Sequence, residues 1–168
     1  MHKKIIVIAI IICILSLNKQ EKVIIPKESI RFRVIASSNN KKDQYVKKQI
    51  VKNLSEELKK TNSLKDIEET RKYIKKELPL FTEIVDKTLK ENNSSNSFHI
   101  DYGKNYFPQK EYNKVTYEEG EYESLVVTLG EGTGKNFWCV LFPPLCFVEE
   151  TKDVKYKSII KEILEKYF

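Results

Sequence analysis

The chain has 168 residues, of which 32% are charged, and a formal net charge of +6. This length is enough for one domain with one hydrophobic core. The charge is unevenly placed, because residues 96–150 carry 4 basic and 9 acidic side chains. The positive excess therefore lies in the N-terminal segment and on Lys-rich helical stretches, where mixed Lys and Glu are typical of a solvated face. This distribution argues against a nucleic-acid partner.

The first residues predict export. Residues 1–4 form a short basic start, and Ile5 to Leu17 is an uncharged apolar run. A membrane span needs about 20 apolar residues, whereas a basic start followed by a shorter apolar run is typical of an export signal. We interpret residues 1–17 as an export signal or an N-terminal membrane anchor, with membrane contact through this segment if it is uncleaved. Residues 18–28 are expected to form a linker.

The next segment predicts one strand followed by helices. Residues 30–34 alternate apolar and basic side chains, which is the period of a half-buried strand. Apolar residues at helical spacing predict an amphipathic helix over residues 42–60. A second helix is expected from an N-cap at Ser63 to about Glu91, with a break or kink at Pro79.

Residues 98–150 predict strands. The expected strands cover residues 98–102, 112–117, 122–129, 137–142 and 145–148, separated by Gly or Pro turns. A stripe of Ile and Leu predicts a C-terminal helix within residues 151–168. The sequence therefore predicts an α+β fold, with one domain over residues 29–150 and a C-terminal helix over 151–168. In this domain an antiparallel sheet is covered on one face by the N-terminal helices.

Few residues suit catalysis. The Gly130–Lys135 segment matches neither a phosphate loop nor a dinucleotide loop, and we interpret it as a turn between strands. The alternative of an exported enzyme would use Cys139 as nucleophile and His99 as base, but no orienting group is evident for this pair. No cofactor is expected. No metal site is expected either, since the available Cys and His spacing is unlike that of structural zinc sites.

Cys139 and Cys146 flank a Pro-Pro corner and form a candidate disulfide. Disulfides persist in exported domains, and a bridge here would close a short loop. The alternative is two buried thiols, which are common in apolar runs. Both states of this pair stay open at the level of sequence.

Two parts of the sequence together resemble the stage II sporulation protein R family. The first is IRFRVIASSN at residues 30–39, followed by Asp43 and Gln44. The second contains Phe107-Pro108, GEYESL at residues 120–125, the glycines of residues 130–136, and WCVLFPPLC at residues 138–146. The resemblance covers roughly residues 28–148. Ser37 stands where the family pattern has Asn, and Phe137 where it has a second Trp.

The resemblance implies signalling rather than catalysis. Proteins of this family are made in the forespore and exported into the space between forespore and mother cell. There they are needed to activate a membrane-embedded aspartic protease of the mother cell, which removes the pro-sequence of sigma-E. The resemblance thus implies this protease as the partner, and the intermembrane space as the location, either secreted or N-terminally anchored. A structural protein of the septal space is a further interpretation.

The corner from Trp138 to Pro144 is the first candidate for a recognition surface, because aromatic anchors beside a rigid turn suit binding hot spots. Asn136 can hydrogen-bond the turn or a partner. Strand alternation sets Trp138 and Phe142 on one side, and we expect that side to be the open face of the sheet. The full set of candidate partner-binding residues is Arg31, Arg33, Asp43, Gln44, Asn136, Trp138, Phe142, Pro143 and Pro144.

Overall fold

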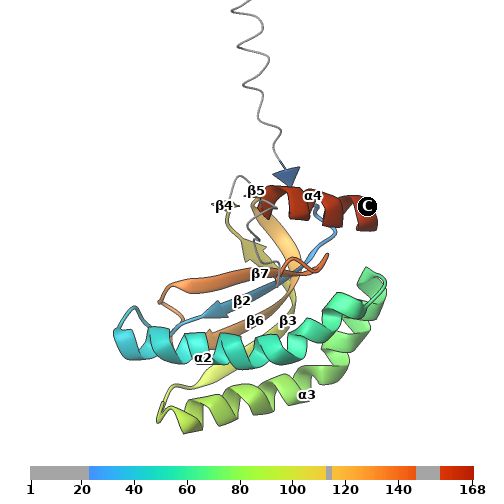
Figure 1. Cartoon of the computed structure of the whole chain (residues 1–168). Helices are drawn as coiled ribbons and strands as arrows, with labels where there is room; N and C mark the ends of the chain where they lie inside the picture. Colours follow the sequence, from blue (N-terminus) through green and yellow to red (C-terminus); the bar gives the residue numbers. More distant parts are fainter. Residues whose placement is uncertain (1–22, 113–114, 147–155) are drawn as a thin grey trace, which may run out of the picture.

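The structure is a computed structural model that describes residues 23–112, 115–146 and 156–168 (Figure 1). The predicted export segment and the first part of the predicted linker lie outside these residues. Within the three described stretches, no helix is both long enough and apolar enough to cross a bilayer.

A four-stranded sheet forms the centre of the fold. Its strands are β2 (Ile30–Ile35), β3 (Phe98–Phe107), β6 (Gly120–Leu129) and β7 (Asn136–Phe142), in the order β3-β6-β2-β7. The α+β prediction is confirmed, but the sheet is mixed, because β2 pairs parallel to β6 and antiparallel to β7. Since β6 and β7 run in opposite directions, a strand inserted between them must be parallel to one of them.

The first long helix, α2 (Lys41–Leu58), begins at Asn40, whose side-chain oxygen accepts a hydrogen bond from the Asp43 backbone N–H at 2.7 Å. A short 3₁₀ helix, η1 (Lys59–Ser63), follows it. The second long helix, α3 (Ile67–Glu91), is capped by Asp66. The predicted N-cap at Ser63 is wrong, because the Ser63 hydroxyl donates back to the Lys60 carbonyl inside η1.

Pro79 lies inside α3, which runs without interruption from residue 67 to residue 91. A break at this proline is therefore wrong. Proline removes one backbone donor and crowds the preceding turn. Ile74 and Phe81, on either side of it, are fully buried, and such tertiary packing supplies most of the stability of a helix.

Helices α2 and α3 pack on one face of the sheet, which we call the helix face (Figure 1). Alternate residues of β2 and β6 point towards them, because successive side chains of a strand face opposite ways. This arrangement buries one contiguous apolar core. The buried members are Ile30, Phe32, Val34, Val46, Ile50, Leu54, Leu58, Ile74, Phe81, Val85, Leu89, Leu125, Val127, Leu129, Leu141 and Phe142.

A smaller sheet and a last helix lie beside the main sheet (Figure 1). The small sheet contains β1 (Val23–Ile24), β4 (Lys110–Tyr112) and β5 (Val115–Tyr117), in the order β1-β5-β4. The helix is α4 (Tyr156–Tyr167), as predicted for the C-terminus. A second apolar cluster joins them to β7. Its buried members are Ile25, Val115, Val140, Leu145 and Ile160.

These elements correct three predictions. Residues 23–25 are part of the fold rather than linker, since β1 pairs with β5 and Ile25 is fully buried. The single strand expected over residues 112–117 is two antiparallel strands, β4 and β5. Residues 145 and 146 lie in the turn after β7 rather than in a strand, and the rest of that predicted strand lies outside the described residues.

Candidate functional site

The register of β2 and β7 places the first candidates on the face opposite α2 and α3, which we call the open face. Arg33 lies opposite Trp138, and Arg31 lies opposite Val140. Phe32, between the two arginines, belongs to the helix-face core, so the arginines point the other way. Trp138 is partly exposed there. The prediction that Trp138 lies on the open face is confirmed.

Strand alternation fails at Phe142. The pairing register shifts at Leu141, as in a β-bulge, so that Phe142 pairs with Ile30 and joins the helix-face core. The expectation that Phe142 lies on the open face is therefore wrong. Pro143 is also buried, whereas Pro144 is partly exposed. Of Phe142, Pro143 and Pro144, only Pro144 therefore offers surface to a partner.

Two arginines and three aromatic rings meet on the open face. The guanidinium carbon of Arg31 lies 3.3 Å from the ring centroid of Tyr122 and 5.3 Å from that of Phe107. The guanidinium carbon of Arg33 lies 5.1 Å from the centroids of both Phe107 and Trp138. Phe107 thus accepts a cation–π contact from each arginine. We call these five residues the arginine–aromatic cluster.

The guanidinium groups of the cluster are poorly satisfied. Arg31 is 2% exposed, and its buried Nε and Nη2 atoms have no hydrogen-bond partner among the described residues. Arg33 donates from Nη1 to the Tyr106 carbonyl at 3.3 Å, while its Nε is unpaired. Burial lowers the pKa of both arginines. In the described part of the chain, neither arginine forms a salt bridge.

A pocket of about 560 Å³ opens beside the cluster. Arg31, Trp138 and Asn136 line it from the main sheet, and Lys110 lines it from β4. The ammonium nitrogen of Lys110 lies 5.8 Å from the Trp138 ring centroid. The site therefore combines cationic groups with aromatic walls, which suits an anionic group carried on an apolar segment.

The Gly-rich turn joins β6 to β7, as predicted, and the backbone explains its glycines. Gly132 has a φ of +64°, which L side chains rarely adopt. A Cβ atom on Gly134 would lie 2.3 Å from the Ser38 carbonyl oxygen. The Thr133 hydroxyl also donates to the Ser37 carbonyl at 2.8 Å. This turn is therefore fixed against the segment that leads into α2.

Asp43 and Gln44 are hydrogen-bonded within the same region. The Asp43 carboxylate accepts from the Ser38 hydroxyl at 2.6 Å and from the Asn96 amide at 3.1 Å. The bond from Ser38 is the main cause of a lowered pKa of Asp43. The Gln44 amide donates to the Ser38 carbonyl at 2.9 Å. Both side chains hold the start of α2, and their contact with a partner stays a prediction.

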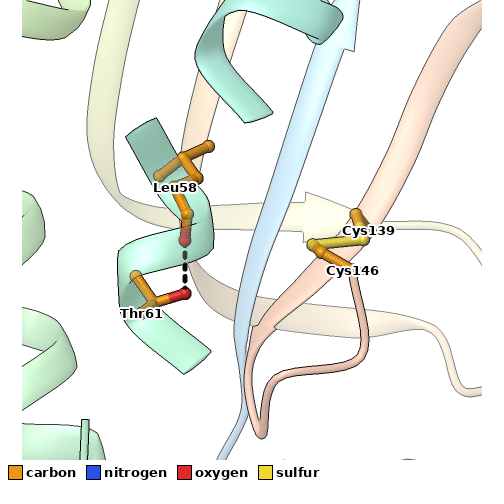
Figure 2. Close-up of a disulfide and its surroundings, with 4 residues drawn as sticks. All are labelled: Leu58, Thr61, Cys139 and Cys146. Atoms are coloured by element: carbon orange, nitrogen blue, oxygen red, sulfur yellow. Dashed lines mark hydrogen bonds between the residues drawn. A yellow bond between two sulfur atoms is a disulfide. The ribbon is translucent and has the colours of Figure 1, made fainter. Parts of the chain in front are cut away.

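Cys139 and Cys146 form a disulfide in the structure, with their Cα atoms 5.3 Å apart. Figure 2 shows this bridge between β7 and the turn after it. The figure also shows the 2.7 Å hydrogen bond from the Thr61 hydroxyl to the Leu58 carbonyl near the end of α2. A cysteine in a disulfide has no thiolate to act as a nucleophile.

The alternative catalytic pair is not assembled. His99 lies exposed on β3, at the opposite edge of the sheet from β7, and Cys139 packs against the helix-face core. Three strand spacings of about 4.8 Å separate these edge strands by about 14 Å. Within the described ranges, no three His, Cys, Asp or Glu side chains gather as a metal site would require.

Phe107, Tyr122 and Lys110 are site residues that the sequence patterns did not predict. Phe107 and Tyr122 lie in the segments that carry the family resemblance, and this position is the one feature of the sequence that could have identified them as site residues. Lys110 carries no comparable signal in the sequence. The proximity of Phe107 and Tyr122 to Arg31 depends on pairing between strands that are distant in the chain.

Comparisons with known proteins point in one direction. Residues 26–152 match the family described as Stage II sporulation protein R (spore_II_R). The chain is also 38% identical over 157 residues to the Stage II sporulation protein R of Bacillus subtilis (strain 168), a match that covers 89% of this chain and 69% of that relative. No solved structure matches the chain. Every residue of the arginine–aromatic cluster lies within the matched segment.

Proposed function

The chain belongs to the stage II sporulation protein R family and has a role in sporulation, and from this premise we propose that it is an exported signal that activates a membrane-embedded aspartic protease of the mother cell. The activated protease then processes pro-sigma-E. The observation that carries this proposal is the family match over residues 26–152. In this mechanism the chain licenses the cleavage and does not make the cut.

The geometry supports a binding role over a catalytic one. The disulfide occupies Cys139, and His99 lies on the far edge strand. The open face instead offers a partly exposed Trp138 and a partly exposed Arg33 beside a pocket. A half-buried tryptophan next to an arginine is typical of the residues that dominate protein–protein binding energies. We propose this face as the surface that the protease recognises.

Deletion of the encoding gene in its sporulating host tests the function. We expect uncleaved pro-sigma-E to accumulate, as measured by immunoblot at the time when wild-type cells have processed it. Reintroduction of the intact gene should restore processing. Normal maturation of sigma-E in the deletion strain would contradict the proposal.

The predicted leader allows a test of where the protein acts. A chain without residues 1–17 should stay in the forespore cytoplasm and fail to restore processing in the deletion strain. The matched control replaces the leader with an unrelated export signal, which should restore processing. A leaderless chain that supports processing would show that export is not required.

A further inference from the structure

The arginine of the pocket is unusual because its bidentate edge has no hydrogen-bond partner in the part of the chain that the structure describes. The Nε and Nη2 atoms of an arginine lie side by side, and this edge can donate two parallel hydrogen bonds to one carboxylate. In Arg31 both of these atoms are buried and unpaired among the described residues. Its guanidinium lies against the aromatic rings of Tyr122 and Phe107, and the charge of Glu118 also acts on it.

Arg71 shows what this edge binds in the same protein. Its Nε donates to one carboxylate oxygen of Glu123 at 2.8 Å, and its Nη2 donates to the other oxygen at 2.6 Å. Glu123 also accepts from the Tyr102 hydroxyl at 2.6 Å. The pair Arg71–Glu123 is thus a complete bidentate ion pair. The same two atoms of Arg31 have no carboxylate partner among the described residues and are closed to solvent, so the side chain must turn towards the pocket before a carboxylate can reach them.

Burial of such an edge without a partner is unfavourable. A charged group taken out of water needs hydrogen bonds or an opposite charge to offset the lost hydration. The ring contacts with Tyr122 and Phe107 offset part of this loss. Two donors remain without a hydrogen-bond partner within the described ranges, and a methionine of similar length would avoid the penalty altogether. The arginine therefore points to a ligand.

We propose that the pocket lined by Arg31 binds the carboxylate of an Asp or Glu side chain from a polypeptide partner. The inference rests on the proposed function, in which that polypeptide belongs to the receptor protease. Trp138 and the disulfide between Cys139 and Cys146 line the same pocket and would contact the residues next to the acid. All residues of β4, which also line the pocket, are exposed, so an extended peptide has access from that side.

The charge pattern favours a polypeptide acid over a lipid surface. The half of the chain that holds most of the pocket is acidic, with 9 acidic and 4 basic residues over 96–150. Glu111 itself lines the pocket beside Lys110. An anionic membrane is attracted by an extended basic surface, which is absent from this half of the sequence. A single recessed guanidinium matches a single carboxylate.

The only tryptophan of the chain is a direct reporter of the pocket, because Trp138 lines it. The test titrates the full-length protein with acetyl-Gly-Glu-Leu-Gly-amide and follows Trp138 fluorescence. We expect a saturable change with this peptide and binding at least about tenfold weaker with the Gln peptide of the same length, since the charge-assisted pair is lost. Two further titrations use inorganic phosphate and vesicles with anionic headgroups as probes.

Two variants of Arg31 separate binding from folding. Arg31→Lys keeps the charge but loses the bidentate edge, so peptide binding should weaken at least about tenfold. Arg31→Met should abolish the difference between the Glu and Gln peptides while leaving the thermal unfolding midpoint unchanged or higher. Arg71→Lys is the matched control, because it makes the same change on the helix face and should leave the titration unchanged.

Equal binding of the Glu and Gln peptides would overturn the inference, as would phosphate or vesicles that compete more strongly than the Glu peptide. A lower unfolding midpoint in Arg31→Met with unchanged peptide discrimination would assign the arginine to the fold alone. The cellular outcome separates the two proposals. If gene deletion blocks pro-sigma-E processing and Arg31→Met restores it fully, the pocket inference fails while the proposed function stands.

Discussion

The two faces of the main sheet differ in how their buried arginines are paired. On the helix face, Arg71 pairs with Glu123 through two hydrogen bonds, and this pairing raises the pKa of Arg71 and lowers that of Glu123. On the open face, Arg31 is more deeply buried and lies against aromatic rings. The charge of Glu118 acts on it, but no salt bridge among the described residues includes it. Arg71 on the helix face therefore has its charged partner, whereas Arg31 on the open face has no ion-pair partner in the described stretches of the chain.

This difference in pairing suggests that the helix face mainly stabilises the fold and that the open face mainly binds a partner. A satisfied ion pair holds α3 to the sheet and leaves nothing for a ligand, whereas an unsatisfied guanidinium lowers stability and offers binding energy. Functional sites commonly show this exchange of stability for activity. Changes on the helix face should therefore alter the free energy of unfolding, and changes on the open face should mainly alter binding.

The largest expected effect is at Phe32, which is 1% exposed in the helix-face core. Phe32→Ala should lower the free energy of unfolding by about 3–5 kcal/mol, because it removes a buried ring and leaves a cavity. Urea denaturation measures this change. Ile35→Ala, on the open side of the same strand and partly exposed, should lower it by only about 1 kcal/mol. Equal losses would remove the distinction between the faces.

The disulfide lies between the two regions, since Cys139 packs on the helix-face core and also lines the pocket. Replacing Cys139 and Cys146 together by Ser should lower the free energy of unfolding by about 2–3 kcal/mol, from the closure of a short loop. Denaturation with and without reductant provides the measurement, because reductant should destabilise only the unmodified protein. If the single variant Cys139→Ser is folded and exported but inactive, this result would support the alternative in which Cys139 is the nucleophile of an enzyme.

Glu123→Gln tests the satisfied pair directly. It should lower the free energy of unfolding by about 1–3 kcal/mol, since Arg71 loses its charged partner in a partly buried site. Peptide binding at the Arg31 pocket should be unchanged, as measured by Trp138 fluorescence. Loss of that binding would mean that the two faces are coupled.

The lowered pKa of Glu123 predicts that the stability of the folded protein depends on pH. The Arg71 hydrogen bond lowers the pKa of Glu123 in the folded state, so its contribution is present above the unfolded pKa of about 4.3. This contribution is lost as the pH falls through the lower, folded value. Thermal unfolding between pH 6 and pH 3 should therefore show a smaller acid loss for Glu123→Gln than for the unmodified protein. Identical acid profiles would contradict this role.

The smallest stability effect is expected for Trp138→Phe. This change keeps an aromatic ring but weakens the contact with Arg33, and should lower the free energy of unfolding by about 1 kcal/mol or less. Processing of pro-sigma-E should fall by more than this small loss explains, because the ring belongs to the proposed recognition surface. Full processing with the Phe variant would move recognition away from Trp138.

Local patterns in the sequence determined the elements that depend on neighbouring residues. The alternation of residues 30–34 predicted β2, the helical spacing after it predicted α2, and the glycines of residues 130–134 predicted the turn before β7. The segments that resemble the sporulation family also contain all five residues of the arginine–aromatic cluster. These signals are readable because periodicity and backbone permissiveness act over a few residues.

Only the tertiary structure decided where those elements meet. The parallel pairing of β2 with β6, the continuity of α3 through Pro79 and the bulge that buries Phe142 all depend on packing between distant segments. The same holds for Arg31, which local alternation placed on a polar face. Phe107 and Tyr122 come from strands far along the chain and turn that exposed position into a buried one, whose bidentate edge has no hydrogen-bond partner among the residues that the structure describes.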